Sequence, residues 1–333
     1  MFDLEKLKQI LSAEPSFRLS QALRLIFVDL LGTWAPATVF PIVLREKLQQ
    51  EFPLPLDAKE FPSSDGRTIK ILLKLADGLS VESVLMSYPG QRNTVCVSSM
   101  VGCPLACTFC ATGKLGFQRN LTAGEIVDQV LYFSRYLKSK GGRVDNVVFM
   151  GMGEPFLNYD NVLEAIRFLN SKDSLNIGAR HFSISTAGIP VGIKKLAKEN
   201  LAVNLAVSLH APNDQLRASL MPIARQYPLE QIFQAVDYYL SASHRKVMFE
   251  YLLIKDKNDG PAAAEALAKL IKKKLYHLNL MTYNLTGIFE SSPPDRCRIF
   301  QSILEKKKVS VTFRHSFGGD IAAACGQLAG RKK

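Results

Sequence analysis

The sequence lacks the segments that membrane, secreted and repeat proteins need. Among its 333 residues, no run approaches the ~18 consecutive apolar residues that span a bilayer. The first residues, MFDLEKLKQILSAEP, mix acidic and basic side chains and do not have the basic-then-apolar order of a signal peptide. Internal repeats and low-complexity tracts are also missing. We therefore expect a globular, cytoplasmic protein with no membrane partner.

Acidic residues are in short supply. Thirty Asp and Glu stand against 42 Lys and Arg, which leaves a net charge of +12. The hydrophobic content of 47% and charged content of 22% are ordinary for globular proteins, so disorder, coiled coil and collagen are excluded. The basic excess favours a polyanionic partner, with nucleic acid ahead of an acidic membrane surface. Basic residues also solvate exposed helix faces, and that explanation stays open.

Cysteine is too sparse for a disulfide framework, because the whole chain has only six. In a reducing compartment such cysteines are metal ligands, catalytic groups or inert core residues. Their positions in the sequence must decide among these roles.

The first 60 residues differ in pattern from the rest of the chain. Amphipathic helices are expected at roughly Leu4–Leu11 and Phe40–Phe52, around a more apolar segment. Prolines and the stretch SSDG predict a boundary near 53–66. We predict a small helical accessory domain over 1–60, which is also a candidate RNA-binding element.

A β-hairpin is expected next, over 61–92. Two β-like runs in TIKILLKLADGLSVESVLMSY are joined through Asp77 and Gly78, a pair that readily forms a tight turn. We interpret this hairpin as the lead-in to the main domain, which we place at 93–333.

From Asn93 onward, short apolar runs alternate with amphipathic helices. The strand candidates are TVCVSS, NVVFMG, HFSIST, LAVNLAVSLH, VMFEYLLI, LNLMTYN and VSVTFRH. Helices are expected near Thr122–Lys138, Tyr159–Asn170, Pro190–Lys198, Leu229–Ser241, Ala262–Lys274 and Asp295–Lys307. This alternation indicates an α/β fold with a parallel sheet, and we predict a partial (β/α)6 barrel. Ligands of such folds bind at the C-terminal ends of the strands.

Three cysteines follow the first of these strands. Cys103, Cys107 and Cys110 have the spacing C-x3-C-x2-C in a loop that contains glycine and proline. Structural zinc usually takes four protein ligands, and no second cysteine pair follows at the usual distance. Three thiolates suit a [4Fe–4S] cluster with one open iron. A zinc site completed by a distant His or Asp remains an alternative.

The spacing of these cysteines after the first strand resembles the radical S-adenosylmethionine superfamily. The resemblance implies a [4Fe–4S] cluster whose open iron binds S-adenosylmethionine, which one-electron reduction cleaves to a 5′-deoxyadenosyl radical. The segment FMGMGEP resembles the glycine-rich contact to the methionine amino group, which would here be Gly153 and Glu154. In the superfamily, residues at further strand ends hold the ribose and adenine. The residues at matching positions here are Ser185, Ser208, Leu209, His210 and Asn284.

Within this superfamily, residues from about 70 to 333 resemble the ribosomal-RNA adenine methyltransferases that modify C2, together with their C8-methylating relatives. The resemblance implies that Cys325 carries a methyl group on sulfur, and that Cys96 later releases the methylated base by forming a disulfide with Cys325. It also implies that Glu82 is the proton acceptor. On pattern alone, Cys96 reads as a small buried hydrophobe and Glu82 as a solvated strand residue. Cys297 matches nothing in the family pattern, and we expect it in the core.

Some features depart from the family pattern. The stretch between Glu82 and Cys96 is one residue longer than in the C2 enzymes, Leu285 stands where proline is usual, and FGGD lies between the C2 and C8 forms. Basic residues near the cysteine loop and in KLIKKK, EKKK and the terminal RKK could contact phosphates, and those near the loop are Lys114, Arg119, Lys138, Lys140 and Arg143.

The sequence therefore predicts a monomeric radical methyltransferase. Its expected substrate is an adenine of 23S rRNA, methylated at C2, with a tRNA anticodon-loop adenine as a further candidate and flavodoxin or ferredoxin as the expected type of reductant. C8 methylation is the alternative within the family. A metal-stabilised RNA-binding module without catalysis is the alternative of another class, and it explains neither Cys325 nor the GMGEP segment.

Overall fold

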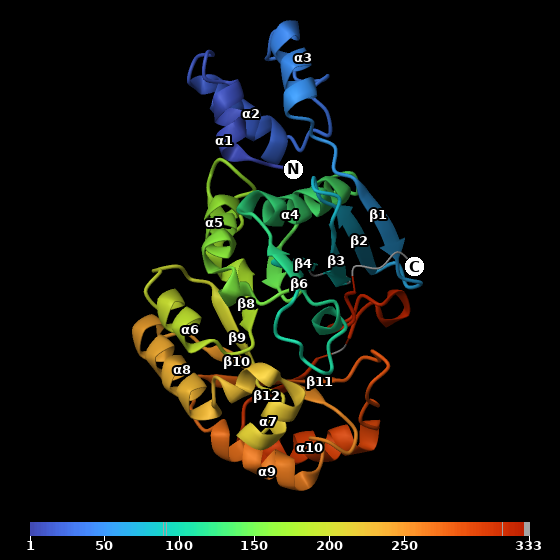
Figure 1. Cartoon of the computed structure of the whole chain (residues 1–333), viewed down its shortest axis with the longest axis vertical. Coiled ribbons are helices and arrows are strands. Elements are labelled where there is room, and N and C mark those ends of the chain that lie inside the picture. The colour runs from blue at the N-terminus through green and yellow to red at the C-terminus, as the bar shows by residue number, and fades with distance from the viewer. Residues whose placement is uncertain (89, 91, 315, 330–333) are drawn as a thin grey trace.

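The computed structural model describes residues 1–88, 90, 92–314 and 316–329. One ten-stranded sheet runs through the molecule in the order β1-β2-β3-β4-β7-β8-β9-β10-β11-β12 (Figure 1). Its strands are β1 (Ala58–Pro62), β2 (Thr68–Lys74), β3 (Ser80–Tyr88), β4 (Arg92–Cys96), β7 (Asn146–Phe149), β8 (Phe182–Thr186), β9 (Asn204–Ser208), β10 (Val247–Leu253), β11 (Tyr276–Thr282) and β12 (Val311–Phe313).

From β4 to β12 every neighbouring pair of strands is parallel. Among the described residues the first and last strands of the sheet do not pair, so the barrel stays open as predicted. Two parts of the prediction fall outside the described residues, namely His315 at the end of VSVTFRH and the terminal Arg331, Lys332 and Lys333.

Helices connect successive parallel strands. They are α4 (Ala123–Lys138), α5 (Tyr159–Asn170), α6 (Pro190–Leu196), α7 (Asp214–Leu220), α8 (Leu229–Ser243), α9 (Pro261–Leu270) and α10 (Pro294–Lys306), with short 3-10 turns η1 (Thr112–Lys114), η2 (Pro155–Leu157), η3 (Ala179–His181), η4 (Pro222–Arg225) and η5 (Gly319–Ile321). A reciprocal capping box of Thr122 and Glu125 starts α4. In the described part of the chain, no helix is both long and apolar enough to cross a membrane.

The lead-in hairpin is confirmed. Strands β2 and β3 pair antiparallel, and Gly78 in the turn between them has φ +84°, which a residue with a Cβ rarely adopts. Strand β3 then pairs antiparallel with β4, with Val84 opposite Cys96. The hairpin therefore extends the parallel sheet. Strand β1 was not predicted, because its sequence AKEFP is charged, largely exposed and ends in proline.

The N-terminal residues form α1 (Leu4–Ile10), α2 (Phe17–Phe27) and α3 (Ile42–Glu51) at one end of the molecule (Figure 1). Two of these helices match the predicted stretches, and the apolar segment between them is also helical. The backbone N–H of Phe2 donates to Asp128 on α4 at 2.7 Å. The division of the chain at residue 60 stays a prediction.

Successive side chains of a strand point to opposite faces of the sheet, and here the two faces have different surroundings. One face packs under the helices through fully buried residues such as Val95, Val147, Ile184, Leu205, Phe249 and Leu278. The alternate residues line a cavity instead, and they include Thr94, Cys96, Asn146, Val148, Ser183, Asn204, Met248 and His277. The barrel interior is therefore hollow rather than filled with side chains.

Candidate active site

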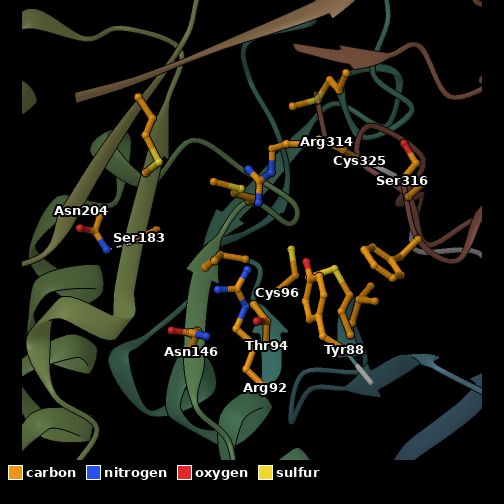
Figure 2. Close-up of a pocket in the computed structure, with 18 of the residues that line it drawn as sticks. Tyr88, Arg92, Thr94, Cys96, Asn146, Ser183, Asn204, Arg314, Ser316 and Cys325 are labelled. Carbon is orange, nitrogen blue, oxygen red and sulfur yellow. Dashed lines mark hydrogen bonds between the residues drawn. The ribbon is translucent and has the colours of Figure 1, made fainter. Parts of the chain in front are cut away.

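The cavity inside the open barrel has a volume of about 730 Å³. Figure 2 shows Cys96, Arg314 and Cys325 around one part of it, with Arg92 and Asn146 further along. Cys96 ends β4, whereas Cys325 follows η5 near the C-terminus. The fold therefore brings to one cavity two cysteines that are far apart in the sequence.

Both cavity thiols are protonated at neutral pH. Burial raises the pKa of Cys96 to about 12, and the nearby Cys325 adds to this effect. The side chain of Cys325 is exposed, but it faces the cavity rather than bulk solvent, and the surrounding protein raises its pKa to about 11. The Arg314 guanidinium lowers the pKa of both thiols, although burial outweighs it. Neither thiol is a ready nucleophile without help in losing its proton.

All six cysteines are free. The disulfide bond expected from the family resemblance is therefore not a feature of this structure. Cys297 is buried on α10, as predicted for a core residue.

Cys103, Cys107 and Cys110 lie in the loop after β5 (Met100–Gly102), which pairs with β6 (Phe117–Asn120) in a separate two-stranded sheet. Burial raises the pKa of Cys103 to about 12 and that of Cys107 further, and the neighbouring Cys110 thiol adds to both shifts because it lies close by. Among the described residues, no three His, Cys, Asp or Glu side chains are arranged around a single metal ion. A four-iron cluster occupies more space than one ion, and three soft sulfur ligands from one loop fit it.

The C-terminal segment is bonded to the cysteine loop. The N–H of Ala111 donates to the Gly326 carbonyl at 2.7 Å, and the Thr112 hydroxyl donates to the Leu328 carbonyl at 2.6 Å. Asn284, which follows β11, donates its side-chain amide to the Cys325 carbonyl at 3.1 Å. Cys325 is thus held between the cysteine loop and the cavity.

Glu154, after β7, is buried and joins two strand ends. Its carboxylate accepts from the Ala187 N–H at 2.7 Å and from the Phe156 N–H at 3.0 Å. Burial raises the pKa of Glu154. Gly153 has φ +103°, and a Cβ there would lie 2.7 Å from Met100 and Ser99, so this close approach requires glycine.

The remaining predicted cofactor residues lie at the ends of β8 and β9. Ser185 and Ser208 are half-buried, and Leu209 is buried. His210 is also buried, its Nδ1 accepts from the Leu252 N–H at 3.1 Å, and burial lowers its pKa to about 3. Its ring contacts Phe109 of the cysteine loop edge-on, with ring centroids 4.9 Å apart. Of these residues, His210 therefore lies directly against the cysteine loop.

Comparisons with known proteins agree with this geometry. A family model described as the radical SAM superfamily matches residues 97–271. The probable dual-specificity RNA methyltransferase RlmN of Dictyoglomus thermophilum is 43% identical over 98% of this chain and 95% of its own length. The corresponding protein of Chloroflexus aurantiacus is 43% identical over 99% and 92%. The chain belongs to the RlmN family of the radical SAM superfamily.

A solved structure supports the membership of the radical SAM superfamily. The crystal structure of a radical SAM methyltransferase from Sphaerobacter thermophilus superposes with a TM-score of 0.94 at 42% identity, covering 99% of this chain and 98% of that chain. Membership of the RlmN family confirms the enzyme class predicted from the sequence. It implies S-adenosylmethionine and a [4Fe–4S] cluster as the general cofactors, and it disfavours the non-catalytic alternative.

Glu82 is not a solvated strand residue, because its side chain is only 1% exposed. It lies on β3 two residues before Val84, which lines the cavity, so both side chains leave the same face of the sheet. Its carboxylate pairs with Lys70 at 2.9 Å and accepts from the Ala329 N–H at 2.7 Å.

Sequence reasoning missed Arg217, a fully buried arginine on α7. Its guanidinium donates to the carbonyls of Ala187 and Ser208, so it ties the ends of β8 and β9 together. Only Arg217 and Leu220 of this short helix are buried, and no local pattern in DQLRASL marks its arginine as a buried residue.

The predicted phosphate-binding residues near the loop have other partners. Arg119 pairs with Asp77 at 2.6 Å and Glu125 at 2.8 Å, and Arg143 pairs with Asp145 at 3.2 Å. Backbone or ring contacts hold Lys114, Lys138 and Lys140. None of them lines the cavity.

A different basic set does line the cavity. Arg92, Arg180 and Lys246 are exposed at or just before the N-terminal ends of β4, β8 and β10, and no Asp or Glu belongs to the described cavity lining. We call these three residues the basic rim. Sequence reasoning missed it because its members are scattered along the chain.

Proposed function

We propose that this chain methylates C2 of an adenine in 23S rRNA through an S-methylcysteine at Cys325. The observation that carries the proposal is that Cys96 and Cys325 line one cavity while the segment around Cys325 is bonded to the cysteine loop. A sulfur that carries the methyl group must lie near the cysteine loop, where it receives that group. It must also lie near a second thiol, whose thiolate later attacks it.

The chemistry of the base explains why a carrier is needed. C2 of adenine is an electron-poor aromatic carbon with no lone pair, so direct polar methyl transfer has no nucleophile to use. One molecule of S-adenosylmethionine would supply the methyl group, and a second, with one electron and a [4Fe–4S] cluster that Cys103, Cys107 and Cys110 would hold, would supply a 5′-deoxyadenosyl radical. The sulfur of Cys325 takes the methyl group, and loss of one hydrogen atom from it gives a carbon radical able to add to C2.

Addition leaves a thioether between Cys325 and adenine, which the chain must cleave. The radical adduct gives up one electron to the oxidised form of the flavodoxin- or ferredoxin-type carrier and its C2 proton to a base, and Glu82 is our assignment for that base. The Cys96 thiolate then attacks the Cys325 sulfur, the S–CH₂ bond breaks, and the methylene carbon takes up a proton to become the methyl group. The resulting disulfide is transient, because two electrons must reduce it before the next turnover.

Glu82 accepts from the Ala329 N–H in the resting structure, and its carboxylate oxygens keep further lone pairs that can take a proton. The cofactor residues assigned by resemblance are Gly153, Glu154, Ser185, Ser208, Leu209, His210 and Asn284. Their positions at strand ends beside the cysteine loop support that assignment.

An RNA substrate is supported by the shape and charge of the cavity. A volume of about 730 Å³ accepts a single flipped-out base, and the basic rim matches the phosphates beside it. The names of the curated relatives also favour RNA and speak of a dual specificity. For a second substrate we propose a tRNA anticodon-loop adenine. A monomer in the cytoplasm, reduced by flavodoxin or ferredoxin, completes the proposal.

The test is an anaerobic reaction of reconstituted protein with S-adenosylmethionine, a reductant and a 23S rRNA fragment. Mass spectrometry of the digested nucleosides should find 2-methyladenosine. The Cys325→Ala variant should keep its cluster iron and form no methyladenosine. Finding 8-methyladenosine would favour the alternative within the family, and finding no methylated base despite cleavage of S-adenosylmethionine would refute the proposal.

A further inference from the structure

A buried ion pair lies beside the catalytic segment. Lys70 on β2 and Glu82 on β3 pair at 2.9 Å, and their side chains are only 6% and 1% exposed. Burying two charges costs free energy unless further hydrogen bonds satisfy the remaining polar atoms. The partners that satisfy this pair therefore indicate what it does.

Those partners are the two ends of the segment that carries Cys325. The Ala329 N–H donates to Glu82 Oε2 at 2.7 Å, and Lys70 Nζ donates to the Ala322 carbonyl at 3.4 Å. Ala322 and Ala329 bound the stretch 322–329, which we call the carrier loop. One ion pair on the hairpin thus contacts both ends of the carrier loop.

The middle of the carrier loop is held from the opposite side. Its contacts there are the bonds from Ala111, Thr112 and Asn284 described above, together with the bond from the Gln327 side-chain amide to the Leu285 carbonyl at 3.1 Å.

Each end of the carrier loop also has a neighbouring bond, from the Ala323 N–H to the Gly318 carbonyl at 2.8 Å and from Thr112 to Leu328. Without the contacts to the hairpin, each end would lose one of its fixed points, and we expect Cys325 to keep its position less well. The bond from the Ala329 N–H to the Glu82 carboxylate suits this task, because at 2.7 Å it is short and charge-assisted, whereas the contact from Lys70 to Ala322 is longer at 3.4 Å.

We propose that Lys70 is a positioning residue of this enzyme, which through Glu82 clamps the carrier loop so that Cys325 can be methylated. The proposal rests on the proposed function for its catalytic consequence, but the clamp itself is a structural claim. The proposal gives Glu82 two roles at different stages of the reaction. As a clamp, Glu82 acts before methylation of Cys325, and as a base it acts after adenine has been attached.

The test compares Lys70→Met with wild type in the reconstituted full-length protein. Hydrogen exchange of the peptide that contains residues 318–329 should become at least about tenfold faster, as expected for losing one charge-assisted hydrogen bond. The fraction of Cys325 that carries a methyl group after a single turnover, measured by peptide mass spectrometry, should fall by a similar factor. Lys70→Arg should restore both values in large part, because it keeps the charge.

Two further variants separate positioning from stability. Lys70→Met with Glu82→Leu replaces the buried pair by apolar side chains, which often restores stability, yet the carrier loop should remain loose. Lys74→Met on the same strand removes an exposed lysine that pairs with Asp57, and it should change neither value. Unchanged exchange of 318–329 in folded Lys70→Met protein would overturn the clamp. So would normal methylation of Cys325 in that variant. A wild type that methylates no RNA would instead refute the proposed function and leave the exchange result valid.

Discussion

At the scale of single residues, burial decides the protonation state of the groups around the cysteine loop. His210 is neutral because its folded pKa of about 3 lies far below its ordinary value near 6.5. Between these two values the unfolded chain binds a proton that the folded chain does not. The free energy of unfolding therefore falls as pH drops through this window.

Replacing His210 by Asn should reduce this acid sensitivity. Asn tolerates the φ of +57° at this position, and its side-chain oxygen can accept from the Leu252 N–H. Urea unfolding at about pH 7 and about pH 5 should show a smaller loss of stability than in wild type, by about 2 kcal/mol for one proton. Equal losses in the two proteins would mean that His210 is not buried in its neutral form.

Residue-scale prediction from the sequence is possible where chemistry follows local spacing. Cys103, Cys107 and Cys110 stand out because three soft ligands crowd one loop. Lys70 could not be identified, since its partner Glu82 becomes its neighbour only through the register of β2 and β3. The charge of Glu82 suggested exposure, whereas the fold buries it.

At the scale of elements, the cysteine loop depends on the small β5–β6 sheet that precedes and follows it. Gly102 ends β5 with φ +76°, and a Cβ there would lie 1.9 Å from the Gly116 carbonyl oxygen. The N–H of Cys103 donates to that same oxygen at 2.9 Å. The backbone geometry at Cys103 therefore requires a glycine at position 102.

Gly102→Ala should push the two strands apart and lower the iron content of the reconstituted protein by half or more. Gly116→Ala is the matched control, because its φ is also positive, at +72°, but no atom lies within 4 Å of the added Cβ. The control should lose only about 1–2 kcal/mol of stability to backbone strain and keep its iron. Equal iron in the two variants would contradict this account of the loop.

Elements with strong periodicity were predictable. Apolar, β-branched runs located the seven parallel strands, and the capping box located the start of α4. The sequence did not reveal α7, β5 or β6, since each is short and its stability comes from tertiary contacts such as those of Arg217 and Gly116. The cavity inside the barrel could not be predicted either. A strand that lines a cavity has the same alternation of apolar and polar residues as a strand with one face in water.

At the scale of the whole molecule, the net charge of +12 is consistent with an RNA partner but does not locate it. The fold suggests a location for the RNA, because it brings the basic rim together at one end of the cavity. The basic residues predicted near the cysteine loop instead contact other protein groups. The rim should therefore contribute phosphate contacts that carry no sequence information.

Changing Arg180 and Lys246 to Gln should weaken RNA binding for all sequences alike. Each lost phosphate contact should reduce the slope of log K against log salt by about 0.7–0.9. Lys194→Gln, an exposed change on α6, is the control and should leave the slope unchanged. Slopes that do not differ among these proteins would place the RNA on another face.

The most direct test of the central claim is a denaturing gel of the Cys96→Ala variant expressed in cells, with and without RNase. Methylation of Cys325 and addition to adenine should proceed, but no thiolate remains to cleave the thioether. The protein should therefore run as a retarded RNA adduct that RNase collapses. If Cys96 only packs in β4, the change should cost about 1 kcal/mol and leave turnover near normal. A single unmodified band from a variant that still turns over repeatedly would contradict the carrier-and-release account.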